Sequence, residues 1–205
     1  MRPPHGACVV LVDAGTPAAD GTCDATPRAV RQALESGAPA VIVLCAGDAP
    51  LTRARGTLRA LGQRLAPLAV EFGARVSRSA TDGLAAWAAS RAAPIGIDVQ
   101  AAPAALDADL LGAALHADEQ AWLAAQPDST LAFAQLWAGK EAVLKAFGVG
   151  LAWSPREVVA LPVANGWHGS NVPALGHAWL SRVVAPGGRR VAVAVALNAG
   201  FARPH

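Results

Sequence analysis

The sequence of 205 residues predicts an α+β fold, and three features carry this prediction. Short runs of β-branched and small apolar residues, such as Ala40–Cys45 and Ile95–Gln100, have the length and composition of strands. A long helical pattern covers Thr130–Phe147. Near the C-terminus, two apolar runs flank Pro186-Gly187-Gly188, as in a β-hairpin. Helices segregated from antiparallel strand pairs indicate α+β architecture.

The remaining elements follow from periodicity and from the residues that interrupt it. The expected strands are Cys8–Val12, Ala40–Cys45, Arg75–Ser79, Leu84–Ser90, Ile95–Gln100, His177–Val184 and Arg190–Leu197. The expected helices are Pro27–Ser36, Pro50–Ala66, Asp118–Ala125 and Thr130–Phe147.

Composition excludes several classes of protein. The formal net charge is only +2, too mild to indicate a nucleic-acid partner. No apolar run approaches the length that spans a bilayer, and we expect a cytoplasmic protein with no membrane partner. Three cysteines without Cys-x-x-Cys spacing argue against a disulfide framework. The phosphate loop, the nucleophile elbow and the dinucleotide fingerprint are all absent, so kinase, hydrolase and dehydrogenase functions lack support.

The only two lysines of the chain, Lys140 and Lys145, lie in one helical segment. The other 15 of the 17 lysine and arginine residues are arginine. On a helical wheel Lys140 falls inside an apolar arc, which is costly unless its ammonium meets an anion. We therefore expect this arc to face a partly polar cleft. Glu141 and Lys145 form an i,i+4 pair, for which a solvated surface salt bridge is an equally good interpretation.

The strand Ile95–Gln100 places Gly96, Asp98 and Gln100 on one face by alternation. A carboxylate and an amide oxygen on one strand face are ligands of the kind that Mg²⁺ takes, together with water and substrate phosphates. Taken alone, Asp98 is more simply a turn or capping residue.

In combination, the two stretches resemble the signature of the 4′-phosphopantetheinyl transferase superfamily. Its members carry a Gly-x-Asp-x-Glu strand followed by a Trp/Phe-x-x-Lys-Glu-x-x-x-Lys helix, matched here by Gly96-Ile-Asp-Val-Gln100 and Trp137–Lys145. Val76–Ser79 is similar to the Ser-His-Ser stretch of the surfactin-synthetase-activating type, and Gly148–Leu151 to the family's Gly-x-Gly-Leu turn.

Three substitutions depart from the pattern. Gln100 replaces the second acid of the strand, Arg78 replaces the histidine between the serines, and Ala138 replaces a small hydroxyl residue of the helix. Arg78 can still bind phosphate through its planar fork. These departures support one alternative, a catalytically weak or inactive relative that binds coenzyme A or a carrier protein. A structural α+β domain with chance motifs is the other.

The resemblance implies two similar α/β halves related by a pseudo-twofold axis, with the active site between them. The halves would be residues 1–92, carrying coenzyme A contacts, and residues 93–205, carrying the metal strand and the motif helix. A chain of this length would act as a monomer.

The resemblance also implies the reaction. The 4′-phosphopantetheine arm of coenzyme A would pass to a serine of an acyl or peptidyl carrier protein of fatty-acid, polyketide or nonribosomal-peptide biosynthesis. Mg²⁺ would be the cofactor, held by Asp98, Gln100 and Glu141. Glu141 would also be the general base, and Lys145 and Lys140 would contact the phosphates.

An arginine-rich stretch from Arg53 to Arg78 contains six arginines and one acid. Arg55 and Arg59 lie at i,i+4 and repel unless an anion lies between them. A solvated basic face is the alternative interpretation. The resemblance makes Arg55, Arg59, Ser77, Arg78 and Ser79 the expected coenzyme A contacts, with the arginines at its 3′-phosphate.

Overall fold

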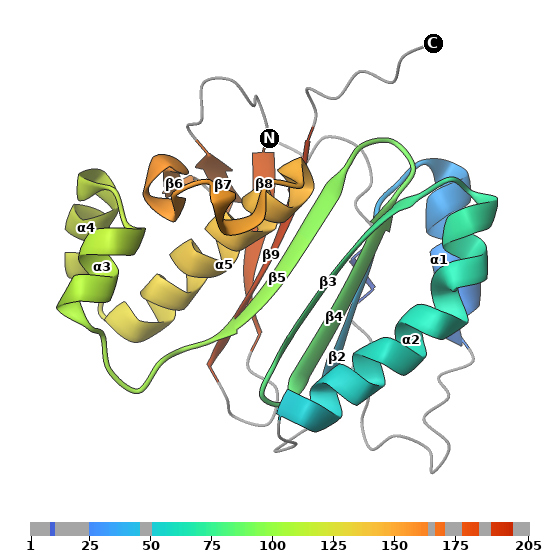
Figure 1. The fold of residues 1–205 in the computed structure, drawn as a ribbon, viewed down its shortest axis with the longest axis horizontal. Coiled ribbons are helices and arrows are strands. Elements are labelled where there is room, and N and C mark those ends of the chain that lie inside the picture. Colours follow the sequence, from blue (N-terminus) through green and yellow to red (C-terminus); the bar gives the residue numbers. More distant parts are fainter. Residues whose placement is uncertain are drawn as a thin grey trace. The chain divides into compact units, whose positions relative to one another are not determined.

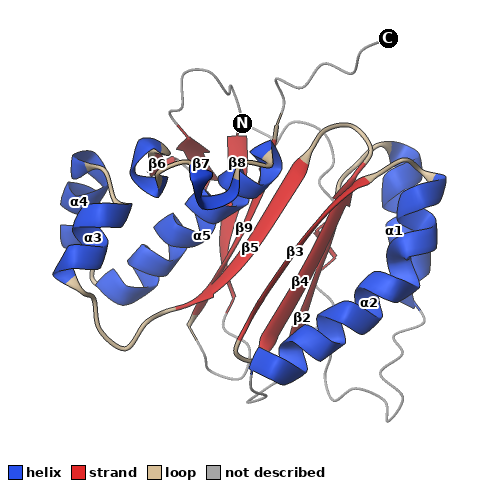
Figure 2. Ribbon diagram, in the orientation of Figure 1, coloured by secondary structure: helices blue, strands red, loops and turns tan. Residues whose placement is uncertain are grey.

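The computed structural model describes residues 9–10, 25–45, 51–163, 167–170, 178–184 and 190–198. It divides the chain into two compact units, Met1–Pro94 and Ile95–His205. Both mix helices with largely antiparallel sheets (Figures 1 and 2). The predicted α+β class is confirmed at this level, whereas the pseudo-twofold relation of two halves stays a prediction.

The first unit is a four-stranded sheet in the order β1-β2-β4-β3. Its strands are β1 (Val9–Val10), β2 (Ala40–Cys45), β3 (Arg75–Thr81) and β4 (Leu84–Ser90). Its helices are α1 (Ala25–Ser36) and α2 (Leu51–Glu71), which pack together over one face of the sheet. Between helices and sheet lies a core that includes Leu34, Leu65 and Trp87.

Helix α2 ends five residues later than predicted, because it continues through Pro67. Proline inside a helix loses one backbone hydrogen bond and crowds the preceding turn. Here Pro67 is exposed, while the next residue, Leu68, is buried in the core. Burial of the last turn therefore outweighs the local signal to stop.

The second unit is a five-stranded antiparallel sheet in the order β5-β9-β8-β7-β6. The strands are β5 (Ile95–Ala101), β6 (Ala160–Val163), β7 (Trp167–Ser170), β8 (Ala178–Val184) and β9 (Val191–Leu197). The predicted antiparallel pair β8–β9 is confirmed, although the Pro186-Gly187-Gly188 loop lies outside the described residues. No helix of the described residues is long and apolar enough to cross a bilayer.

The helices of this unit are α3 (Ala108–Ala114), α4 (Ala117–Ala124) and α5 (Ser129–Phe147). Helix α5 lies along β5, β9 and β8, and α4 packs against α5 (Figure 1). Two short 3₁₀ turns, η1 (Gly150–Ala152) and η2 (Pro155–Glu157), follow α5. They return the chain toward the edge strand β6.

Three elements of the second unit were not expected from sequence. Helix α3 is capped by the preceding residue, Asp107, whose Oδ1 accepts hydrogen bonds from the Asp109 and Leu110 amides at 2.8 and 3.0 Å. This N-cap was a readable signal. Strand β6 contains Pro162, which is tolerated because β6 is an edge strand and can do without one donor. Its partner β7 is only four residues long.

Candidate functional site

Close packing of α5 on β5 builds the candidate site. Gly96 lies where the helix crosses the strand, and a Cβ at this position would be 1.8 Å from the carbonyl oxygen of Ala142. On the neighbouring strand β9, the residues paired with Gly96 and Asp98 are Ala196 and Ala194. Small residues on the sheet thus allow the helix backbone to approach the strand directly.

This approach brings Asp98 to the side chains of α5. Lys145 Nζ donates to Asp98 Oδ1 at 2.6 Å and to the Ile97 carbonyl oxygen at 3.3 Å. Asp98 is 8% exposed and Lys145 is 30% exposed, so solvent reaches the lysine side of the pair. The surface pair Glu141–Lys145, considered from sequence, is not the ion pair that Lys145 forms.

Glu141 lies next to this pair. The pKa of Glu141 is raised above its usual value, first by burial and then by the negative charge of Asp98, with Lys145 opposing both. The side chain of Glu141 forms no hydrogen bond or ion pair with another residue of the described part of the chain. A carboxylate whose pKa is raised by the charge of a neighbouring carboxylate favours a cation between the two.

These residues fit a hard divalent cation when substrate supplies further ligands. Asp98 and Glu141 offer carboxylate oxygens. The Gln100 amide nitrogen donates to the Ala101 carbonyl oxygen at 3.3 Å, which leaves the amide oxygen as its available ligand. Within the described residues no group of three or more His, Cys, Asp or Glu side chains could hold a metal. A site with two carboxylates matches Mg²⁺, which commonly keeps water and substrate phosphate oxygens.

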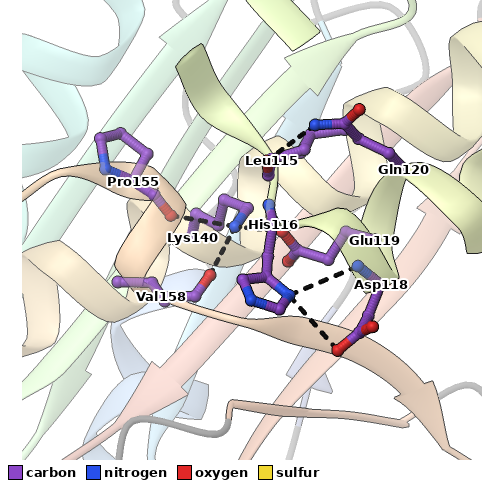
Figure 3. Close-up of polar contacts among 8 residues, drawn as sticks. All are labelled: Leu115, His116, Asp118, Glu119, Gln120, Lys140, Pro155 and Val158. Carbon is purple, nitrogen blue, oxygen red and sulfur yellow. Dashed lines mark hydrogen bonds and ion pairs between the residues drawn. The ribbon is translucent and has the colours of Figure 1, made fainter. Parts of the chain in front are cut away.

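Lys140 occupies a different environment, although only five residues separate it from Lys145. Its Nζ donates to Glu119 Oε2 at 2.6 Å, to the Pro155 carbonyl oxygen at 2.9 Å and to the Val158 carbonyl oxygen at 2.5 Å (Figure 3). Lys140 and Glu119 are both fully buried. Because an ammonium has three N–H groups, these acceptors use all of them.

Burial lowers the pKa of Lys140, and the Glu119 carboxylate counteracts that effect. The same Glu119 oxygen accepts a hydrogen bond from the His116 amide at 2.8 Å, completing a capping box at the start of α4 (Figure 3). Lys140 thus joins α5, α4 and η2. The predicted position of Lys140 inside an apolar arc is correct, but that arc faces the interior rather than a cleft. This geometry does not support the expected contact between Lys140 and phosphate.

Three of the predicted coenzyme A contacts, Ser77, Arg78 and Ser79, lie on strand β3, where they occupy opposite faces. Val76 packs with the core beneath the helices, so alternation places Arg78 on the same, helix-covered face and Ser77 and Ser79 on the opposite one. Arg78 lies against Gly62 of α2. Arg55 and Arg59 are exposed on α2. The structure therefore groups Arg78 with the helix and separates it from the serines.

Comparison with known proteins gives a family match for the second unit. A model of the 4′-phosphopantetheinyl transferase superfamily matches residues 94–195, about half of the chain, including β5 and α5. This match supports placing the chain in that superfamily of transferases. It does not distinguish the surfactin-synthetase-activating type from others.

One solved structure similar to this chain is the holo-[acyl-carrier-protein] synthase of Thermotoga maritima. The identity is 22% and the TM-score 0.40, over 52% of this chain and 64% of that one. The match thus spans less than two thirds of that synthase. No curated protein matches this chain.

Proposed function

We propose that this protein transfers the 4′-phosphopantetheine arm of coenzyme A to a serine of an acyl or peptidyl carrier protein, with Mg²⁺ as cofactor. The observation that carries the proposal is the convergence of Asp98, Glu141 and Lys145 where α5 meets β5. It adds to the family match over the same residues.

The reaction forms a bond between the serine oxygen and the β-phosphorus of coenzyme A. It breaks the bond from that phosphorus to the bridging oxygen, releasing adenosine 3′,5′-bisphosphate. Catalysis of such a step consists mainly of alignment and charge neutralisation. Asp98 and Glu141 would hold Mg²⁺, with the Gln100 amide oxygen as a neutral third ligand, and the cation would neutralise the pyrophosphate.

Two residues would act on the charges that develop during the reaction. Glu141 would accept the serine proton, and its raised pKa brings it closer to the pKa that suits a general base near neutral pH. Lys145 would neutralise the leaving phosphate. Its ammonium now rests on Asp98 Oδ1, and a cation that took over this oxygen would release it toward the phosphates. No nucleophile is needed from this chain, because the serine belongs to the carrier.

Lys140 takes a structural role in this proposal, since its three donors are already used within the protein. Arg55, Arg59 and Arg78 would contact the 3′-phosphate of coenzyme A from the first unit. Ser77 and Ser79 remain proposed coenzyme A contacts, on the other face of β3. We also propose the two-half, monomeric type of the family.

The test is intact-mass measurement of a panel of apo carrier proteins after incubation with the protein, coenzyme A and Mg²⁺. We expect one carrier to gain the mass of one phosphopantetheine arm, with loss of the gain in Glu141→Gln. The matched control is Glu157→Gln, which removes an exposed acid of the same unit.

No gain on any carrier, with coenzyme A still bound, would instead establish a binding protein without transferase activity. The substitutions Gln100, Arg78 and Ala138 are what would favour that second function.

A further inference from the structure

Arg78 is held against the backbone of α2 by the absence of a side chain at Gly62. A Cβ at Gly62 would lie 3.2 Å from Arg78 Cζ, 3.4 Å from Nη1 and 3.5 Å from Nε. Because three guanidinium atoms lie at nearly equal distances, the flat face of the Arg78 guanidinium group is turned toward Gly62. Gly62 is buried, whereas Arg78 as a whole is exposed.

The position of Gly62 on the helix selects which other arginines lie near Arg78. At about 100° per residue, Arg59 and Arg55 lie on the same flank of α2 as Gly62. Arg53 and Arg64 lie on the opposite flank. Arg59 precedes Gly62 by three residues, or about 4.5 Å along the axis, and Arg55 by seven, or about 10.5 Å. On that flank, Arg59 is therefore the arginine of α2 whose backbone lies nearest Gly62, against which Arg78 packs.

Arg59 and Arg78 give this flank two cationic side chains, and like charges repel one another unless an anion lies between them. The acid that follows on the same helix, Glu71, does not serve, because Arg31 binds both of its oxygens at 2.6 and 2.8 Å. Guanidinium groups are well suited to a phosphate monoester, since their planar forks match its oxygens.

We propose that Gly62 is a specificity-determining residue, which positions Arg78 beside Arg59 as a two-arginine site for the terminal 3′-phosphate of coenzyme A. This inference rests on the proposed function and deepens it by naming the partner of Arg78. Arg55 then contributes less to binding of the 3′-phosphate than Arg59 does, and Arg53 and Arg64 do not contribute to it.

The experiment compares binding of coenzyme A and 3′-dephospho-coenzyme A by isothermal titration calorimetry. We expect the unsubstituted protein to bind coenzyme A at least tenfold more tightly than the dephospho form. Gly62→Leu and Arg78→Ala should each remove most of this preference, and Gly62→Ala should reduce it several-fold. Arg59→Ala should lower the preference more than Arg55→Ala, and Arg53→Ala should leave it unchanged.

Gly56 gives a matched control, since it lies exposed on the same helix with nothing within 4 Å of its would-be Cβ. Alanine is a better helix former than glycine, so Gly56→Ala should raise the melting temperature without changing the preference. Gly62→Ala should weaken the preference, and thermal melting of both variants shows whether that loss occurs in a folded protein.

Three results would overturn the inference. The preference could survive in Gly62→Leu, or Arg53→Ala could lower it as much as Arg59→Ala. The unsubstituted protein could also bind both forms equally while still modifying a carrier, which would leave the proposed function intact. Failure of the proposed function looks different, because neither form would then bind and no carrier would gain mass.

Discussion

Helix α5 carries two lysine–carboxylate pairs of the same length and of opposite character. Lys140–Glu119 and Lys145–Asp98 both measure 2.6 Å, but the first pair is fully buried, whereas Lys145 is 30% exposed. Lys140 has all three donors satisfied by protein, and Lys145 has a neighbouring carboxylate, Glu141, with no partner among the described residues. We call Lys140–Glu119 a closed pair, because it is buried and can only stabilise the fold. Lys145–Asp98 is an open pair, because solvent or a ligand can reach it and replace one partner. The comparison shows that the two lysines of the motif lie in different environments, one buried and one partly open to solvent.

Removal of Lys140 should have the largest effect on stability. Lys140→Met removes the ammonium paired with the buried Glu119 carboxylate, and breaking a buried pair typically costs about 3–5 kcal/mol. Urea unfolding followed by circular dichroism measures this loss. Lys145→Met is the matched control, and we expect it to cost about 1 kcal/mol or less, because that pair is partly solvated. Equal losses in the two variants would contradict the distinction between a closed and an open pair.

A double variant sharpens the same comparison. Lys140→Met combined with Glu119→Leu removes both charges, and replacement of a buried pair by apolar residues is often neutral. We expect the double variant to recover at least half of the stability lost in Lys140→Met. It should also still transfer the arm if Lys140 is structural. A stable double variant without activity would return Lys140 to the catalytic site.

Gly96→Ala should have the next largest effect, since a methyl group there would collide with the helix backbone at Ala142. We expect a loss of about 1–3 kcal/mol from overpacking, and weaker Mg²⁺ binding because α5 moves away from Asp98. Gly112→Ala in α3 is the control, as nothing lies within 4 Å of its would-be Cβ. Unfolding curves and Mg²⁺ titration check both effects, and an unperturbed Gly96→Ala would disprove the close approach.

Lys145→Met should strengthen Mg²⁺ binding in the absence of coenzyme A, because the ammonium no longer competes for Asp98 Oδ1. We expect about tenfold tighter binding, which corresponds to about 1.4 kcal/mol. Calorimetry with Mg²⁺ measures it, and Arg190→Met, which removes a cation paired with Asp128, is the control. Weaker or unchanged binding in Lys145→Met would mean that Lys145 does not occupy the cation position.

The smallest expected effect is on the pH dependence of stability. The pKa of Glu141 in the folded protein lies above the ordinary value of 4.5, so the folded state binds this proton more tightly than the unfolded state does. Ionisation therefore costs stability, and stability contributed by the protonated form is lost as pH rises from about 4.5 through the folded pKa. Without Mg²⁺, Glu141→Gln should flatten the unfolding free energy over this interval. The same slope in both proteins would assign it to another group.

Most elements were readable from local sequence, because their periodicity and their breakers agree with the fold. Strands β2 and β4 begin and end at the expected residues, and α5 begins one residue early and ends at Phe147 as expected. Pro67 misled the prediction for α2, since burial of Leu68 outweighed the local cost of proline. The short strands β6 and β7 have too few residues for a periodic signal.

The candidate site was predictable only in part. Asp98, Glu141 and Lys145 stood out through their spacing and the family resemblance. Glu119 lies in the first turn of α4, where an acid is favourable to the helix dipole and so attracts no attention, and nothing in the sequence joined it to Lys140 across 21 residues. The helical wheel placed Lys140 in an apolar arc without showing what the arc would face.

The sequence by itself determined the α+β class, the helix that carries both lysines and the strand that carries Asp98, since periodicity and motif spacing are local properties. Only the tertiary structure decided which lysine is buried, which carboxylate each one meets, and that Arg78 lies against Gly62. Those pairings join residues on separate elements, and they depend on how closely backbones approach where glycine and alanine leave no side chain in the way.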